Sequence, residues 1–127
     1  MRAPQPPRPT ESELSILQIL WRRGPCTVRQ VVEELGPDTG YTTGLKLLQI
    51  MTEKGLVTRD DAERTHVFAA AHPAEATRRQ LLDHLLDRAF GGSAALLVQQ
   101  ALAGRKPCKT EIAGLRRLLD TIEGRKP

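Results

Sequence analysis

The sequence predicts a mainly α-helical protein: a winged helix-turn-helix of three helices and a small β-hairpin, followed by C-terminal helices suited to dimerisation. Three observations predict it. Two capping-box patterns each open a helix. A third helix, ended by glycine, precedes two short strand patterns around a charged tip. Three apolar stripes at helical spacing then fill the rest of the chain.

The composition is that of a small globular protein. The 127 residues fit one domain, or one small domain with a helical extension, and a second copy would add buried area to so short a chain. Hydrophobic residues make up 39% and charged residues 27%, as expected for a folded chain. Aromatic residues are scarce, which argues against a platform for stacking single-stranded bases.

Net charge alone does not identify a partner. The overall charge of +4 is typical of proteins with a polyanionic partner. The excess of basic residues, however, lies in the C-terminal half and not in the half that contains the predicted helix-turn-helix. Residues 1–72 hold nine basic and nine acidic side chains, and residues 73–127 hold ten and six. The placement of individual basic residues must therefore carry any argument for nucleic acid.

The N-terminal half is predicted to contain three helices. Residues 1–9 hold four of the nine prolines and are expected to form a flexible arm. Thr10 and Glu13 form a capping box for a helix to about residue 23, with the stripe Leu14, Leu17, Leu20 and Trp21. A second capping box, Thr27-Val28-Arg29-Gln30, opens a short helix, and a third helix is expected over 41–54, before Gly55.

A hairpin and three more helices are predicted after Gly55. Residues 56–59 and 65–69 resemble strands around the charged tip 60–64, which completes a winged helix-turn-helix domain over 10–72. The dimerisation domain, 73–127, starts with a helix from Pro73 to about residue 90, and Ser93 can cap the next helix. The residues expected at the dimer interface are apolar: Leu82, Leu85, Leu86, Phe90, Leu97, Ile112, Leu115, Leu118, Leu119 and Ile122.

The third helix is amphipathic, and its polar face has two interpretations. Thr42, Thr43, Lys46 and Gln49 lie on or beside the face opposite Leu48. In a DNA major groove the threonines could contact phosphates, while Lys46 and Gln49 could reach base edges. A solvated helix face would carry similar residues. Arg59 and Arg64 bracket the hairpin tip and could reach DNA, or could pair with the acidic residues between them.

Several motifs resemble the penicillinase-repressor family in order and spacing. They are Thr10-Glu11-Ser12-Glu13-Leu14, Ile19-Leu20-Trp21, Gly24-Pro25-Cys26-Thr27-Val28-Arg29-Gln30-Val31, Tyr41-Thr42-Thr43, Leu47-Leu48, Glu53-Lys54-Gly55-Leu56-Val57, Leu85-Leu86-Asp87-Arg88, Phe90-Gly91-Gly92-Ser93, Glu111-Ile112 and Leu115-Arg116-Arg117-Leu118-Leu119. Together they cover nearly everything after the arm.

The resemblance implies a homodimeric repressor that binds a palindromic operator in double-stranded DNA. Thr42, Thr43 and Lys46 become the favoured DNA contacts, with Arg59 and Arg64 from the wing and Gln49 in reserve. In family members that control antibiotic resistance, a membrane sensor-protease triggers cleavage of the repressor and so releases the DNA.

The chain departs from the family pattern in three respects. Gly44 stands where a β-branched aliphatic residue is usual, which should cost about 1 kcal/mol of helix propensity and loosen the packing. Lys46 and Gln49 lie at positions that vary in the family, so the operator sequence of relatives cannot be assigned to this chain. Cys108 replaces a capping serine, and the last helix is expected to fray at its start unless Thr110 caps it.

Other classes of protein find little support in the sequence. Cys26 and Cys108 are isolated, and His66, His72 and His84 lack ligand spacing, so we expect no metal and no cofactor. No nucleophile or phosphate-cradle motif suggests an enzyme. With neither a secretory signal nor a membrane-length apolar run, the cytoplasm is the expected location. A winged-helix module that binds protein and not DNA remains the alternative, favoured by the neutral charge of residues 1–72.

Overall fold

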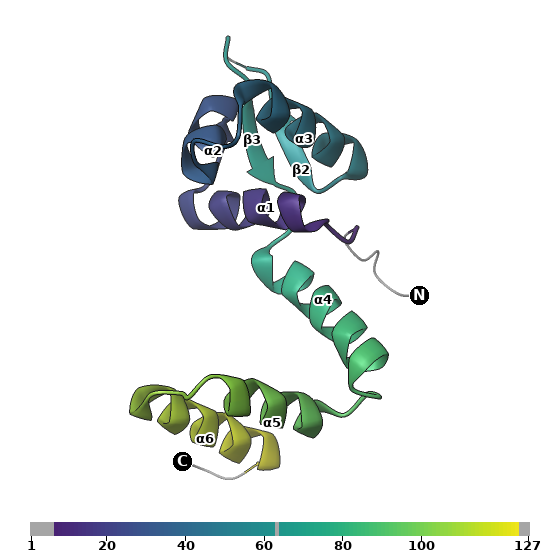
Figure 1. Cartoon of the computed structure of the whole chain (residues 1–127), viewed down its shortest axis with the longest axis vertical. Coiled ribbons are helices and arrows are strands. Elements are labelled where there is room, and N and C mark those ends of the chain that lie inside the picture. The colour runs from purple at the N-terminus through teal and green to yellow at the C-terminus, as the bar shows by residue number, and fades with distance from the viewer. Residues whose placement is uncertain (1–6, 63, 125–127) are drawn as a thin grey trace. The chain divides into compact units, whose positions relative to one another are not determined.

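A computed structural model describes residues 7–62 and 64–124 as a mainly helical protein with a small sheet (Figure 1). In chain order the elements are α1 (Glu11–Arg23), β1 (Cys26–Thr27), α2 (Val28–Leu35), α3 (Tyr41–Lys54), β2 (Val57–Asp60), β3 (Val67–Ala70), α4 (Ala74–Ala89), α5 (Ala94–Gly104) and α6 (Lys109–Glu123). The predicted winged helix-turn-helix with C-terminal helices is confirmed. Residues 1–6 of the predicted arm lie outside the described residues.

Both predicted capping boxes are present. The Thr10 and Glu13 side chains each accept a hydrogen bond from the other residue's backbone N–H, at 3.2 and 2.8 Å. Thr27 and Gln30 repeat the arrangement at the start of α2. These reciprocal bonds satisfy amide groups that a helix start otherwise leaves without partners, and so fix where α1 and α2 begin.

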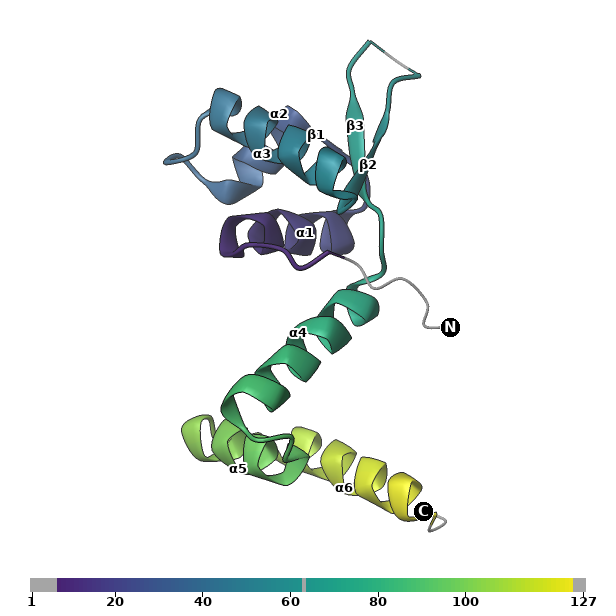
Figure 2. The same cartoon turned by 90° about the vertical axis from the view of Figure 1, so that its right-hand side faces the viewer.

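The wing belongs to a three-stranded antiparallel sheet in the order β1-β3-β2. Cys26 pairs with Phe68, and Arg59 pairs with the same residue from the other side. The sequence predicted β2 and β3 within two residues of their observed bounds but missed β1, which is only two residues long. Figure 2 shows the hairpin extending beyond the sheet beside α2 and α3.

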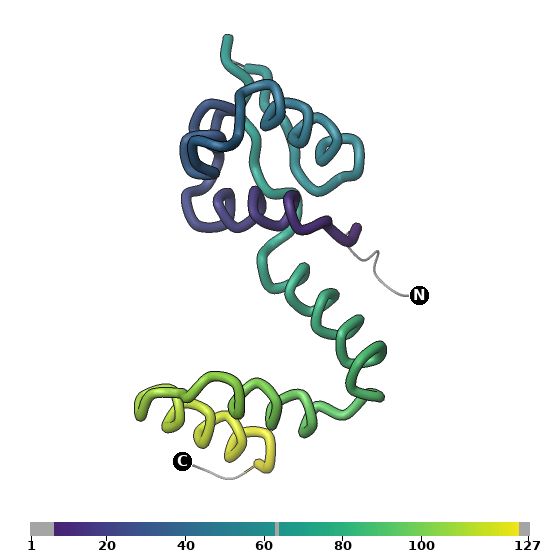
Figure 3. The backbone as a smooth tube through the Cα atoms, in the orientation of Figure 1, coloured from purple at the N-terminus to yellow at the C-terminus, as the bar shows by residue number. Residues whose placement is uncertain are grey.

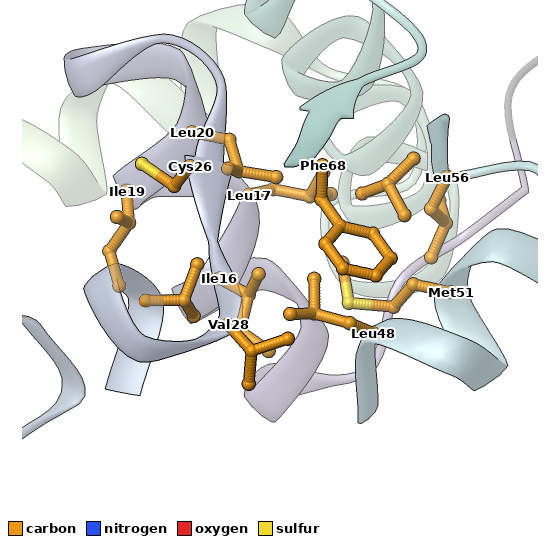
Figure 4. Packing of buried hydrophobic residues seen from close by; sticks show 12 residues of the cluster. Ile16, Leu17, Ile19, Leu20, Cys26, Val28, Leu48, Met51, Leu56 and Phe68 are labelled. Carbon is orange, nitrogen blue, oxygen red and sulfur yellow. The ribbon is translucent and has the colours of Figure 1, made fainter. Parts of the chain in front are cut away.

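The core of the N-terminal part lies between α1, α2, α3 and the sheet. Figure 4 shows the Phe68 ring among Leu17, Leu48 and Met51. The buried apolar residues come from every element up to β3: Ile16, Leu17, Ile19, Leu20, Cys26, Val28, Val31, Leu48, Met51, Leu56, Val57 and Phe68. Burial of these side chains fixes α3 against the rest of the domain.

Two hydrogen bonds hold the chain where it leaves the wing, a path that can be followed in Figure 3. The Trp21 Nε1–H donates to the His72 carbonyl at 3.1 Å, and His72 Nε2 lies 3.2 Å from the Gly55 carbonyl. Helix α4 begins at Ala74, one residue after the predicted start, and the Pro73 carbonyl accepts a bond from Ala76.

The chain divides into two compact units that meet between His84 and Leu85, inside α4. The second unit differs sharply from the first. Neither α5 nor α6 contains a buried residue in the described chain. The Ser93 hydroxyl caps α5 as predicted, accepting from Leu96 at 3.1 Å, whereas Cys108 gives α6 no side-chain cap. No described helix combines the length and apolar character that a membrane span requires.

Candidate nucleic-acid interface

Helix α3 presents a polar face and is held by its opposite face. Thr42, Thr43, Lys46 and Gln49 are exposed, while Leu48 and Met51 are fully buried. The helix starts after Gly40, and no side chain caps its first turn. Backbone N–H groups there remain available to an external acceptor.

The close contact between α2 and α3 corrects one prediction from the sequence. Gly44 is buried, and a Cβ placed on it would lie 2.5 Å from Cγ2 of Val32 in α2. The expectation that Gly44 loosens the packing is therefore wrong. Glycine lets the two helices approach more closely than any residue with a side chain would allow.

In the described part of the wing, the Asp61 carboxylate contacts two basic side chains. The Asp61 carboxylate lies 2.9 Å from Nε of Arg59 and 2.6 Å from Nδ1 of His66. Arg59 thus adopts the local pairing that the sequence left open. Arg64 is exposed, and it has no hydrogen-bond or ion-pair partner among the described residues.

A hollow of about 510 Å³ separates the wing from the starts of α2 and α3. These three segments lie far apart along the chain, so the sequence alone does not bring them together. Arg29 comes from α2, Tyr41 from α3, and Arg64 from the hairpin. The complete lining is Thr27, Val28, Arg29, Tyr41, Leu45, Arg64, Thr65 and His66.

Residues 1–72 have no net charge, but their basic side chains differ in whether an acidic side chain pairs with them. Glu34 binds two cations of α1, Arg22 at 2.6 Å and Arg23 at 3.1 Å. Buried Glu13 binds Lys54 at 2.7 Å. Among the basic residues of α2, α3 and the wing, three have no hydrogen-bond or ion-pair partner in the described chain: Arg29 of α2, Lys46 of α3 and Arg64 of the wing.

The cysteines and histidines do not form a second site. Cys26 is buried and donates from Sγ to the Gly24 carbonyl, and burial raises the pKa of its thiol, which disfavours the reactive thiolate. His84 bonds to Arg8 at 2.7 Å. In residues 7–62 and 64–124, no three His, Cys, Asp or Glu residues gather in a way that could hold a metal ion.

The C-terminal helices expose most of the apolar residues predicted at the dimer interface. Leu118 is 55% exposed and Ile122 is 71% exposed. Leu82, Leu85, Ile112 and Leu119 are also exposed, and the structure adds Leu96, Val98 and Leu102, which the prediction omitted. Leu86, Phe90, Leu97 and Leu115 are half-buried.

Three packed helices with a hairpin wing, and a third helix that exposes one polar face, define a winged-helix protein. Residues 9–121 match the penicillinase repressor family, and the chain belongs to that family. The predicted resemblance is confirmed. The prediction that the chain is not an enzyme agrees with this membership, because the family consists of transcriptional regulators.

Individual relatives match parts of the chain. The transcriptional regulator BlaI of Mycobacterium tuberculosis is 40% identical over 63 residues, which is 47% of this chain and 46% of that protein. The match thus spans about half of the relative's length. The solution structure of the DNA-binding domain of the repressor BlaI is 17% identical, with a TM-score of 0.50, over 58% of this chain and 93% of that domain.

A C30AH42A mutant of ZitR from Lactococcus lactis is similar over a longer stretch. It is 17% identical, with a TM-score of 0.52, over 91% of this chain and 74% of that chain. At such low identity the two structural matches establish the fold alone.

Proposed function

We propose that the chain is a transcriptional repressor that binds operator DNA with α3 in the major groove and the wing beside the flanking backbone. The observation that carries this proposal is the exposed face of α3. Thr42, Thr43 and Lys46 occupy it, and Lys46 has no partner among the described residues. Major-groove base edges offer acceptors to such a lysine, and threonine hydroxyls suit phosphate oxygens. Such a protein would act in the cytoplasm, with the chromosome.

Lys46→Ala is expected to weaken binding to the operator by about 1–3 kcal/mol if Lys46 reads a base. Genomic fragments captured by the purified protein supply the duplex, and fluorescence anisotropy at fixed salt measures affinity. Lys106→Ala removes another exposed lysine, from the loop between α5 and α6, and should leave affinity unchanged. Equal affinities of wild type and Lys46→Ala would remove Lys46 from the interface.

Salt dependence separates DNA binding from the alternative protein-binding role. Specific DNA binding releases counterions, so affinity should fall steeply as salt rises. A protein that captures no DNA fragment above background would overturn the repressor proposal and favour the winged-helix interaction module.

We further propose that the repressor is a homodimer formed through α4, α5 and α6, and that its operator is palindromic. The exposed leucines and isoleucines of these helices support the proposal, because α5 and α6 bury no residue in the single chain. A second copy would cover them. Two-fold symmetry would present two α3 helices to two half-sites of matching sequence. The proposed boundary between the DNA-binding and dimerisation domains stays at residues 72 and 73.

Leu118→Asp is expected to yield monomers, because it places a charge in the apolar interface. Leu118 is 55% exposed in the single chain, so the substitution should leave the fold intact. Sedimentation equilibrium measures the mass, and circular dichroism checks the helix content. Ala113→Asp adds the same charge on the opposite side of α6 and should remain dimeric. A dimer in both variants would contradict the proposed interface.

Release from DNA is proposed to follow inactivation of the repressor, through a membrane sensor-protease as in relatives that control antibiotic resistance. Membership in the family supports this route. Mass spectrometry of the repressor from cells in which its target genes are switched on would detect the cleavage. Intact repressor under those conditions would contradict it.

A further inference from the structure

The hollow between α2, α3 and the wing has the composition of an anion site. Val28 and Leu45 supply its apolar lining, while Arg29, Arg64 and His66 supply basic groups. No acidic residue lines it. The hollow therefore gathers basic residues without a carboxylate in its lining.

Two of these basic side chains are available to a ligand. Arg29 and Arg64 form no hydrogen bond or ion pair with any described residue. His66 differs, because its Nδ1 lies 2.6 Å from the Asp61 carboxylate. Asp61 also binds Arg59, so this carboxylate is engaged on the wing and is not part of the lining.

The lining also supplies neutral donors. Thr65 and Tyr41, which carry hydroxyl groups, line the hollow, and Tyr41 is 54% exposed. Guanidinium groups and hydroxyls are among the side-chain groups that contact phosphate oxygens in protein–DNA complexes. A guanidinium can bind two phosphate oxygens at once.

Two residues of the lining belong to α3, the helix that carries the proposed reading face. Tyr41 and Leu45 lie on the same helix as Thr42, Thr43 and Lys46. An anion between Arg29 and Arg64 would sit next to the first turn of α3. A phosphate of the strand flanking the contacted bases is the anion that a bound duplex brings to such a position.

We infer that this hollow binds one phosphate of the DNA backbone, with Arg29 of α2 and Arg64 of the wing both contacting it. This inference rests on the proposed DNA-binding function and extends it to Arg29 and Tyr41. Its role is to fix the register of α3 on the duplex, because phosphate contacts position a protein without reading sequence.

Arg29→Gln is expected to weaken binding roughly tenfold for the captured fragment and for a scrambled duplex alike. It should also reduce the slope of log affinity against log salt by about one phosphate contact. Arg22→Gln is the matched control, because Arg22 is already paired with Glu34 and lies outside the hollow. That control should bind as wild type does.

Neutral methylphosphonates, placed at one backbone position at a time in the captured duplex, identify the seated phosphate. At one position per half-site, the methylphosphonate should lower the DNA affinity of the wild-type protein roughly tenfold. It should leave the affinity of the Arg29→Gln variant almost unchanged. Equal losses for both proteins at every position would overturn the inference. So would an Arg29→Gln variant that binds as tightly as wild type.

Two further outcomes distinguish failure of the phosphate assignment from failure of the proposed DNA-binding function. A wild-type protein that captures no DNA contradicts the proposed function itself. Inorganic phosphate that shifts the Arg29 amide resonance, in a protein whose DNA affinity is insensitive to Arg29→Gln, would assign the hollow to a free anion and overturn the backbone assignment.

Discussion

Replacing Glu13 by alanine is expected to lower the free energy of unfolding by about 3 kcal/mol. Glu13 is only 2% exposed, and its Oε1 accepts bonds from Lys54 Nζ at 2.7 Å and from the Thr10 N–H at 2.8 Å. Alanine would remove half of the capping box and leave Lys54 without its anion. The Lys54 side chain is 34% exposed, so water can replace part of the lost contact and the loss stays near the lower end for buried pairs.

Urea unfolding followed by circular dichroism measures this change. Glu11→Ala is the matched control, because Glu11 lies in the same first turn but is exposed. It should change stability by less than about 0.5 kcal/mol. A Glu13→Ala protein as stable as Glu11→Ala would show that the contact between α1 and α3 contributes little.

The same contact should make stability depend on pH. Burial raises the pKa of Glu13, but the Lys54 ammonium and the hydrogen bonds from Thr10 and Lys54 outweigh it, so the pKa lies below its ordinary value of 4.5. The ionised form is therefore favoured in the folded state, and its stabilisation is complete above that ordinary value. As the pH falls through the lowered pKa, this stabilisation is lost. The difference between wild type and Glu13→Gln should accordingly shrink below pH 4.5.

Local patterns in the sequence were sufficient to predict most of the fold. Capping boxes involve residues three apart, so Thr10 with Glu13 and Thr27 with Gln30 could be recognised directly. Helical periodicity placed Leu48 and Met51 on the buried face of α3. The strand β1 was missed because two residues carry no periodicity, and its pairing with Phe68 depends on a segment forty residues away.

The candidate site was predictable only where it lies on one helix. Periodicity put Lys46 and Gln49 on the exposed face, and the structure agrees. The hollow could not be predicted, because Arg29, Tyr41 and Arg64 converge only after α2, α3 and the wing have packed. The contact between Gly44 and Val32 is likewise tertiary, so the sequence could not show that Val32 occupies the space beside Gly44, and the expectation of looser packing was wrong.

Gly44→Val is expected to cost about 3 kcal/mol of folding stability, because the added side chain would overpack the contact between α2 and α3. Its Cβ alone would lie 2.5 Å from Val32 Cγ2, and the valine methyls would add to the overlap. Val32 cannot easily turn away, because β-branched side chains have one strongly preferred rotamer in a helix. Relief requires α3 to move from α2, which would displace Lys46 and weaken DNA binding as well. Unfolding in urea and anisotropy titrations measure the two effects.

A second substitution tests whether the overlap is the cause. Val32→Ala removes the methyl that a Gly44 side chain would meet, so the double variant should be more stable than Gly44→Val alone by about 1–2 kcal/mol. Gly114→Val serves as a control in α6, where an added Cβ would meet only the Arg117 Nη2 at 3.9 Å. Since valine has the higher helix propensity, that variant should be no less stable than wild type. Additive effects of Val32→Ala and Gly44→Val would mean that the two residues do not share one space, and that the distance between α2 and α3 is set elsewhere in the core.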